Sequence, residues 1–272
     1  MRKRYVLLIA ILLLAFAAGL AWQLSQPREP MYEGRPLSYW LEGYNFDSRT
    51  ETSEQSADLA MREIGTNAIP TLLRMLQESD SPLKVKFFAL VERQSLIKVR
   101  HVTAVERNYS AFKGFESLGA SARVAVPVLI QIYGRNNSDE TRIFTACSLG
   151  AIGPAAKAAV PILLSGLMAT NPAVRFNAVL ALGKIHSDAE MVLPYLTNAL
   201  SDTNRSVRAF AFEALGDFGA DAKPTVPLLI KFLNDPDPHL RKYALSALKQ
   251  IDPQAATNLP TNLQPVDLQA RP

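Results

Sequence analysis

A repeat with a period of about 33 residues constrains the fold of this chain more than any other feature of its sequence. Segments reading NAIPTLLRML, VAVPVLIQIY, AAVPILLSGL, MVLPYLTNAL and PTVPLLIKFL share one form, and the last four follow one another at nearly equal intervals. A series of arginines recurs with the same period, and so does a Leu-Gly pair. The series are Pro70, Pro127, Pro161, Pro194 and Pro227; Arg142, Arg175, Arg208 and Arg241; and Leu149-Gly150, Leu182-Gly183 and Leu215-Gly216. Three independent series with one period indicate a repeat architecture.

Each repeat is predicted to contain two helices, as residues 170–202 illustrate. Asn171-Pro172 begins the first helix, because a proline at the first helical position loses no hydrogen bond. Apolar residues at helical spacing follow as far as Ile185. Ser187-Asp188 begins the second helix, with Pro194 expected within about its first turn, where proline is tolerated. No alternation typical of strands competes with this pattern in the body of the chain, which predicts an all-α fold.

The repeats resemble a known family. NPAVRFNAVLALGKI followed by VLPYLTNALSD, with an echo in RSVRAFAFEALGDFGADAKPTVPLLIKFLND, is similar to HEAT repeats, in particular the short HEAT-like repeats of phycobilisome lyases. This resemblance implies an α-solenoid of HEAT-like helix pairs that winds into a right-handed superhelix. A single pair cannot bury its apolar face, so neighbouring pairs stack into one core. We expect the solenoid to cover residues 57–252.

The resemblance also implies a binding surface. In such solenoids the second helices are expected to line the concave face. Polar residues four positions after each proline, with one tyrosine at the first position, would then form a ladder on that face: Arg74, Gln131, Ser165, Asn198 and Lys231, with Tyr195. The same variability is also what an ordinary solvated face would show, and both interpretations stay open.

The recurring prolines and arginines are interpreted as structural positions. An arginine repeated at every interface suits a contact between adjacent repeats. Its expected partners are acidic or amide groups nearby: Asp139, Asn171, Asp202, and Asp235 or Asp237. We expect the prolines to set the geometry at the start of each second helix.

The first residues predict a membrane segment. The run from Val6 to Trp22 contains no polar side chain and is preceded by Arg2, Lys3 and Arg4. Such a run spans roughly 26 Å as a helix, at the short end for a bilayer crossing. Basic residues before it should stay in the cytoplasm, so residues 1–24 would be a single-pass anchor in the cytoplasmic (inner) membrane with the body outside the cytoplasm. A cleaved signal peptide, which would leave a secreted or periplasmic body, is the alternative.

The flanks of the solenoid depart from the period. Residues 25–56 are predicted to be a linker followed by a short amphipathic helix at 35–44 that caps the first repeat. The interval from Pro70 to Pro127 is much longer than the others and suggests an expanded or three-helix unit, with a helix starting at Ser81-Pro82 and a capping box at Thr103 and Glu106. Prolines crowd residues 253–272, which are predicted to be a disordered tail.

The expanded unit contains a basic stretch. Residues 84–107 carry six basic and two acidic side chains, a formal charge of +4. This stretch is either a solvated helix face or a weak contact with anionic lipid headgroups close to the anchor.

Residues that would carry chemistry are sparse. The chain has one cysteine and three histidines, which lie in separate segments, and it lacks the motifs of serine hydrolases and of nucleotide-binding loops. We therefore predict no cofactor, no metal site and no enzymatic activity. The net charge is +4, but residues 31–272 carry 25 basic and 24 acidic groups, which makes nucleic acid an unexpected partner.

These observations favour a non-catalytic scaffold or adaptor that binds protein partners outside the cytoplasmic membrane. An enzyme-accessory or lyase-like HEAT module and a non-specific nucleic-acid binder are the alternatives.

Overall fold

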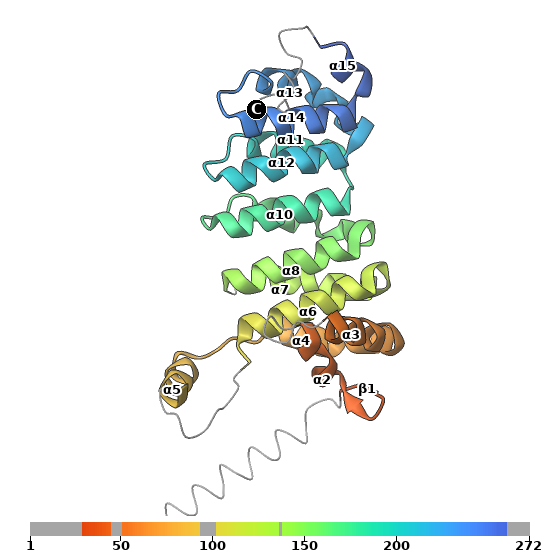
Figure 1. The fold of residues 1–272 in the computed structure, drawn as a ribbon, viewed down its shortest axis with the longest axis vertical. Helices are drawn as coiled ribbons and strands as arrows, with labels where there is room; N and C mark the ends of the chain where they lie inside the picture. The colour runs from red at the N-terminus through yellow and green to blue at the C-terminus, as the bar shows by residue number, and fades with distance from the viewer. Residues whose placement is uncertain (1–28, 45–50, 93–101, 136–137, 260–272) are drawn as a thin grey trace, which may run out of the picture.

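The computed structural model describes residues 29–44, 51–92, 102–135 and 138–259. Helices stacked along one long axis make up nearly all of these ranges (Figure 1). The strands that they contain form one short antiparallel hairpin, β1 (Met31–Tyr32) and β2 (Arg35–Pro36). The predicted stack of helix pairs is thus confirmed for the described chain, whereas the apolar run at residues 6–22 lies outside it.

The helices form two layers. The first layer consists of α6 (Ala104–Leu118), α8 (Asp139–Ile152), α10 (Pro172–Ile185), α12 (Arg205–Asp217) and α14 (Pro238–Ile251). The second consists of the shorter α4 (Ile69–Leu76), α7 (Val126–Gly134), α9 (Val160–Gly166), α11 (Ala189–Ala199) and α13 (Val226–Phe232). Most pairs are joined by 3₁₀ turns: η3 (Gly65–Ala68), η4 (Gly119–Ala125), η5 (Gly153–Ala159) and η6 (Gly219–Thr225). One continuous apolar core fills the space between the layers.

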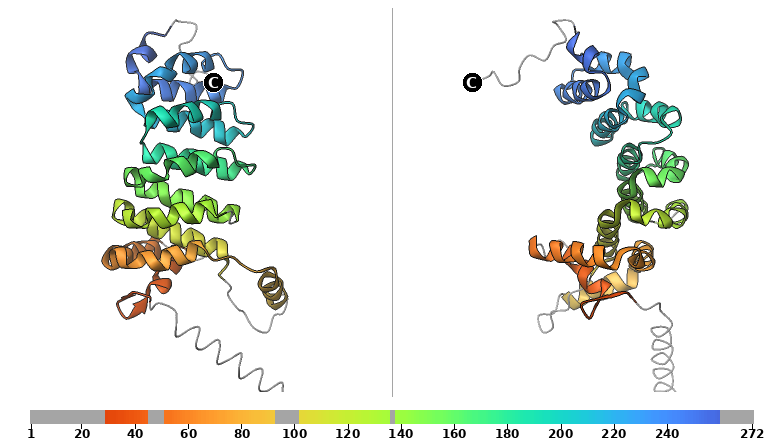
Figure 2. Two further views of the ribbon diagram at one scale, coloured as in Figure 1. Left: turned by 180° about the vertical axis from the view of Figure 1, so that it is seen from behind. Right: turned by 90° about the vertical axis from the view of Figure 1, so that its right-hand side faces the viewer.

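The stack is bowed, with the first layer on the inner side (the right-hand view of Figure 2). Small residues let the inner helices come close. A Cβ built on the glycine of one helix would lie a few ångströms from the Cα of an alanine on the next: 3.1 Å for Gly150 and Ala181, 3.2 Å for Gly183 and Ala214, and 3.6 Å for Gly216 and Ala247. In the outer layer, Gly134 and Gly166 at the ends of α7 and α9 face side chains and not the backbone of a neighbouring helix, and the stack curves toward the first layer. The prediction that the second helices line the concave face is therefore wrong.

Side chains at equivalent positions begin the inner helices. The Asn171 Oδ1 accepts a hydrogen bond from the backbone N–H of Ala173 at 2.8 Å, and Asn204 and Asp237 cap α12 and α14 in the same way. Such caps satisfy N–H groups that have no partner within the helix. The capping box predicted at Thr103 is present at the start of α6.

Four of the inner helices end at residues with positive φ, the first of them α6 at Gly119 with φ of 51°. Gly153 and Gly219 have φ values of 70° and 48°, and His186 takes the equivalent position one period after Gly153 with φ of 46°. The chain then enters η4, η5 or η6 after the glycines, but after the histidine it reaches α11 without a 3₁₀ turn. Consequently Pro194 lies inside α11 rather than in its first turn, unlike the prolines at the starts of α4, α7, α9 and α13.

The residues before α3 (Glu51–Ile64) form an N-terminal cap on the stack. Helix α2 (Leu37–Leu41) and the turn η1 (Glu42–Tyr44) bury Leu37, Leu41 and Tyr44 against α3 and α6. The Tyr44 hydroxyl donates a hydrogen bond of 2.6 Å to Asp58 Oδ1. Helix α3 starts at Glu51, so the first repeat begins before the predicted boundary at residue 57.

Two predictions about the flanks are corrected. The extra residues between α4 and α6 do not add a third packed helix, because α5 (Pro82–Glu92) projects away from the stack while α4 packs directly on α6 (Figure 1). The end of the body also extends beyond residue 252: α15 (Pro253–Thr257) packs on α14, and Leu259 is buried. Asp252 starts α15 by accepting a hydrogen bond from the N–H of Ala255.

Two stretches of the described chain, Ala104–Gly134 and Asp139–Gly166, are long and apolar enough to cross a membrane. Each is interrupted by a glycine with positive φ, Gly119 or Gly153, where the chain passes from one layer to the other. They are therefore weak candidates for a membrane span and are explained by packing in the stack.

Candidate binding groove

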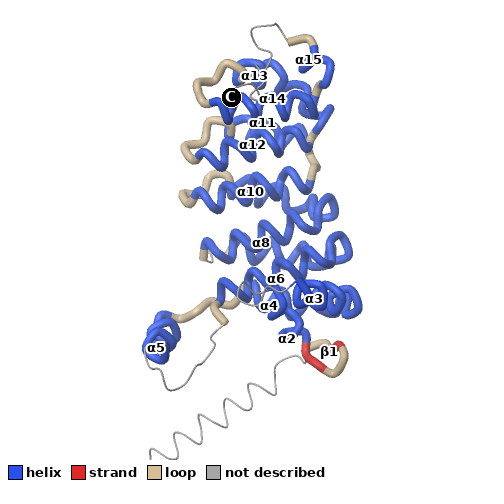
Figure 3. Tube along the Cα trace, viewed as in Figure 1, coloured by secondary structure: helices blue, strands red, loops and turns tan. Residues whose placement is uncertain are grey.

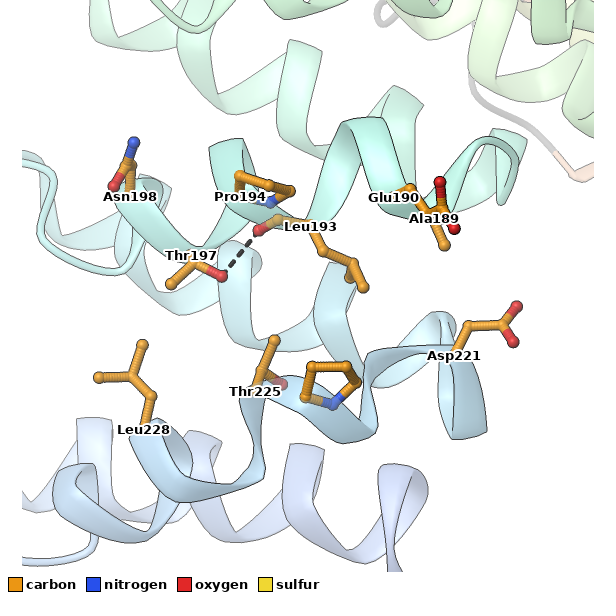
Figure 4. Close-up of a pocket in the computed structure, with 10 residues that line it drawn as sticks. Ala189, Glu190, Leu193, Pro194, Thr197, Asn198, Asp221, Thr225 and Leu228 are labelled. Atoms are coloured by element: carbon orange, nitrogen blue, oxygen red, sulfur yellow. Dashed lines mark hydrogen bonds between the residues drawn. The ribbon is translucent and has the colours of Figure 1, made fainter.

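An open groove lies on the outer layer, between α11 and the segment formed by η6 and α13 (Figure 4). Its volume is about 830 Å³. The residues that line it are Ala189, Glu190, Leu193, Pro194, Thr197, Asn198, Asp221, Pro224, Thr225 and Leu228. Sites of this size, mostly apolar with a few polar groups, are typical places for ligands to bind.

The groove exists because the repeat formed by α10 and α11, the fourth in the stack, differs from its neighbours. After His186, Asp188 also has a left-handed backbone, with φ of 53°, and α11 starts at once. The next repeat instead places the 3₁₀ turn η6 before α13. A helix that faces a 3₁₀ turn does not match it in shape, and α11 and α13 contain no glycine that would let the two repeats come closer. A hollow therefore remains between the two repeats.

Polar groups lie at both ends of the groove. The exposed carboxylates of Glu190 and Asp221 lie at one end, on opposite walls, and Asn198 lies at the other (Figure 4). In the described part of the chain neither carboxylate forms an ion pair. The two threonines are already engaged as donors, since Thr197 and Thr225 give their hydroxyl protons to backbone carbonyls at 2.7 Å. The polar side chains at the acidic end are the carboxylates of Glu190 and Asp221, which accept hydrogen bonds.

Proline inside α11 leaves one backbone carbonyl without its usual donor. Pro194 has no N–H, so the carbonyl of Glu190, four residues earlier, lacks its usual helical donor. Leu193 points from α11 toward the opposite wall of the groove (Figure 4), and Pro224 is another apolar residue of the lining. The arrangement can receive N–H donors and a positive charge beside apolar side chains.

The predicted ladder lies on the outer layer rather than in a concave channel. Its residues come from the successive outer helices α4, α7, α9, α11 and α13, and all except Arg74 are exposed: Gln131, Ser165, Asn198, Lys231 and Tyr195. Arg74 is half-buried and forms an ion pair of 2.7 Å with Glu29, which ties the N-terminal cap to α4. Asn198 is the residue of the predicted ladder that lines the groove.

The arginine series makes structural contacts. Arg175 pairs with both oxygens of Asp202, at 2.7 and 2.8 Å, which is the contact with an acidic group of the adjacent loop that the period suggested. The hydrogen bonds from Arg175 lower the pKa of the Asp202 carboxyl. Arg208 and Arg241 instead donate to backbone carbonyls of the loops before their own helices, and Arg142 lies over the ring of Tyr133.

The inner helices carry aromatic rings that the sequence analysis missed. Phe176 of α10 packs edge to face against Phe210 of α12, with ring centroids 4.7 Å apart. The signal was present as a further series with nearly the same period, namely Phe144, Phe176, Phe210 and Tyr243. The phenylalanine rings are half-buried and pack against the core, whereas Tyr243 is exposed. We therefore interpret this series as part of the packing between repeats.

Side chains that could hold a metal ion are dispersed. Across the ranges that the structure describes, His, Cys, Asp and Glu do not form a group of three or more suited to that purpose. Cys147 donates a hydrogen bond of 3.1 Å to Asn177 Oδ1, and burial raises the pKa of its thiol to about 11. A thiol with such a pKa is a poor nucleophile at neutral pH.

Comparison with known families agrees with the geometry of the stack. Residues 126–203 and 193–260 match the family model of HEAT repeats. The protein contains HEAT repeats. The matched residues run from α7 to α15 and include the whole groove. A search of curated proteins returned no match for the chain.

Proposed function

We propose that this HEAT-repeat protein is a non-catalytic scaffold that binds an extended segment of a partner protein in the groove between α11 and α13. The observation that carries the proposal is the groove itself, whose apolar floor has the carboxylates of Glu190 and Asp221 at one end. HEAT repeats commonly provide surfaces for protein interactions, and this groove is a hollow shared by two of them.

The groove favours a particular kind of segment. A lysine or arginine of the partner would lie between Glu190 and Asp221, where it meets two carboxylates without an ion-pair partner in the described chain. Apolar side chains next to that basic residue would cover Leu193 and Pro224.

We further propose that residues 6–22 anchor the protein in the cytoplasmic membrane as a single pass, with the repeats outside the cytoplasm. The apolar run and the basic residues before it support this placement. Cleavage of the segment would release the same repeats as a secreted or periplasmic protein. The likeness to the short repeats of phycobilisome lyases and the right-handed superhelix remain predictions.

Site-specific photocrosslinking in native membranes tests the proposal. A photoreactive amino acid replaces Asn198 in the groove, and the matched control places it at Met168, an exposed residue just after α9. We expect a defined protein adduct from position 198 and none from position 168. The adduct should disappear when Glu190→Lys and Asp221→Lys are combined, and it should persist in Glu213→Lys, which reverses an exposed charge elsewhere. Equal adducts from both positions, or an adduct insensitive to the groove charges, would refute the proposal.

A further inference from the structure

Helix α5 does not pack into the solenoid, although most of its residues are apolar. It projects from the N-terminal end of the stack, and no helix of the described chain covers it (Figures 1 and 2). Seven of its eleven residues are apolar: Leu83, Val85, Phe87, Phe88, Ala89, Leu90 and Val91. Because these residues are distributed around the whole helix, no one face of it is polar enough to suit water.

The exposure of individual side chains supports this point. Leu83 is 80% exposed and Val85 is 52% exposed, whereas apolar residues of the other helices mostly lie in the core. Burying side chains of this kind is worth about 1.5–3 kcal/mol each, so α5 has a strong tendency to find an apolar environment.

A cluster of charges fixes the base of α5 to the solenoid. Asp80, just before the helix, accepts hydrogen bonds from Lys84 Nζ at 2.8 Å, from the N–H of Ala104 at 2.6 Å and from Arg107 Nη2 at 3.1 Å. Burial alone would raise the pKa of the Asp80 carboxyl, but the hydrogen bonds outweigh it and lower the pKa to about 2. The start of α5 and the start of α6 are thereby held together, so the helix leaves the stack from a fixed point.

The position of α5 points to a membrane. The described chain begins at Glu29, which is paired with Arg74 of α4, and the nearby β1 lies at the same end of the stack as α5 (Figure 1). The apolar run ends at Trp22, seven positions before Glu29, and a chain of that length spans at most about 25 Å when fully extended. If the run is in the bilayer, this end of the solenoid stays close to the membrane surface, within reach of α5.

We propose that α5 is a second membrane contact, which lies in the interface of a bilayer that contains anionic lipids and orients the solenoid on that surface. Leu83, which is 80% exposed, enters the apolar boundary, while the long side chain of Lys86 reaches back to the level of the phosphates. The positive charge of Lys86 suits anionic headgroups. The proposal rests on the anchoring of residues 6–22 proposed above.

Labels placed on the full-length chain measure whether α5 enters lipid. In a Cys147→Ser background, a single cysteine at Leu83 carries a fluorophore, and the matched control carries it at Met168, which is 68% exposed at a distance from α5. The protein is reconstituted into phosphatidylcholine vesicles with and without phosphatidylglycerol. Nitroxide-bearing lipids and a water-soluble quencher then report the environment of each label.

We expect lipid quenching at position 83, stronger with phosphatidylglycerol, and water quenching at position 168. Because each basic residue near an anionic surface contributes about 1 kcal/mol, Lys86→Gln should shift the docking equilibrium of α5 about fivefold toward water. Lys157→Gln, an exposed lysine in η5, should leave the equilibrium unchanged.

Three results would overturn the proposal in different ways. Protein that floats with the vesicles while its position 83 label stays accessible to water would refute the α5 contact and leave the anchor in place. Protein that does not float would refute both. A label at position 83 that is shielded equally in detergent without lipid would show that protein covers α5, as in contact with a second copy.

Discussion

Replacing Gly183 by alanine tests whether close packing of the inner helices sets the curvature of the stack. Alanine is favoured over glycine inside a helix by about 1 kcal/mol, so helix propensity alone predicts a more stable protein. In this structure, however, the new Cβ would lie 3.1 Å from the Cβ and 3.2 Å from the Cα of Ala214 on the next helix. The backbone of α12 would have to move, and overpacking of this kind costs about 1–3 kcal/mol.

The two effects oppose each other, and we expect a net loss of about 0.5–2 kcal/mol in the free energy of unfolding. Urea unfolding followed by circular dichroism measures this loss. The matched control is Gly134→Ala, at the end of the outer helix α7, where the nearest atom to the new Cβ is 3.7 Å away. The control should be neutral or slightly stabilising. A Gly183→Ala protein that is more stable than the wild type would refute the argument that inner helices are in close contact there.

Three further changes test other contacts. Arg175→Ala should lower the free energy of unfolding by about 1–3 kcal/mol. Because the pKa of Asp202 is lowered in the fold, this difference is present above the ordinary Asp pKa of 3.8 and should shrink as the pH falls below it, as unfolding at pH 7 and pH 2.5 would show. Gly219→Ala meets no atom within 4 Å but keeps φ at 48°, so it should cost about 1–2 kcal/mol through the backbone alone, and no loss would refute this reasoning. Leu259→Ala should cost about 2–4 kcal/mol because Leu259 is buried, whereas an unchanged midpoint in urea would place it outside the core.

The sequence predicted the repeated parts of the fold because each of them depends on contacts that recur at every interface. The glycine at position 183, the arginine at 175 and the cap at Asn171 all keep one period, and each makes the kind of contact that a stacked helix pair requires. The direction of curvature was predicted wrongly, because the resemblance implied second helices on the concave face. The direction depends on which of the two layers is packed more tightly, and a period shared by both layers does not distinguish them.

The candidate groove could not be predicted because it arises from a break in the pattern. His186 replaces a glycine and the 3₁₀ turn is missing after it, but neither change alters the apolar period of the fourth repeat. Of the residues singled out from the sequence for binding, Asn198 is the one that lines the groove. The position of α5 was also missed, since an apolar helix is normally assigned to a core and the sequence does not show that α4 packs directly on α6.

The most direct test of the account is the selection of peptides from a displayed random library on the full-length protein in lipid nanodiscs. We predict enrichment of segments in which a lysine or arginine is next to apolar residues, and loss of their binding when Glu190→Lys and Asp221→Lys are combined. Glu213→Lys should bind the same peptides as the wild type. No enrichment, or enriched peptides that bind the double variant equally well, would contradict the claim that the groove between α11 and α13 is a peptide-binding site.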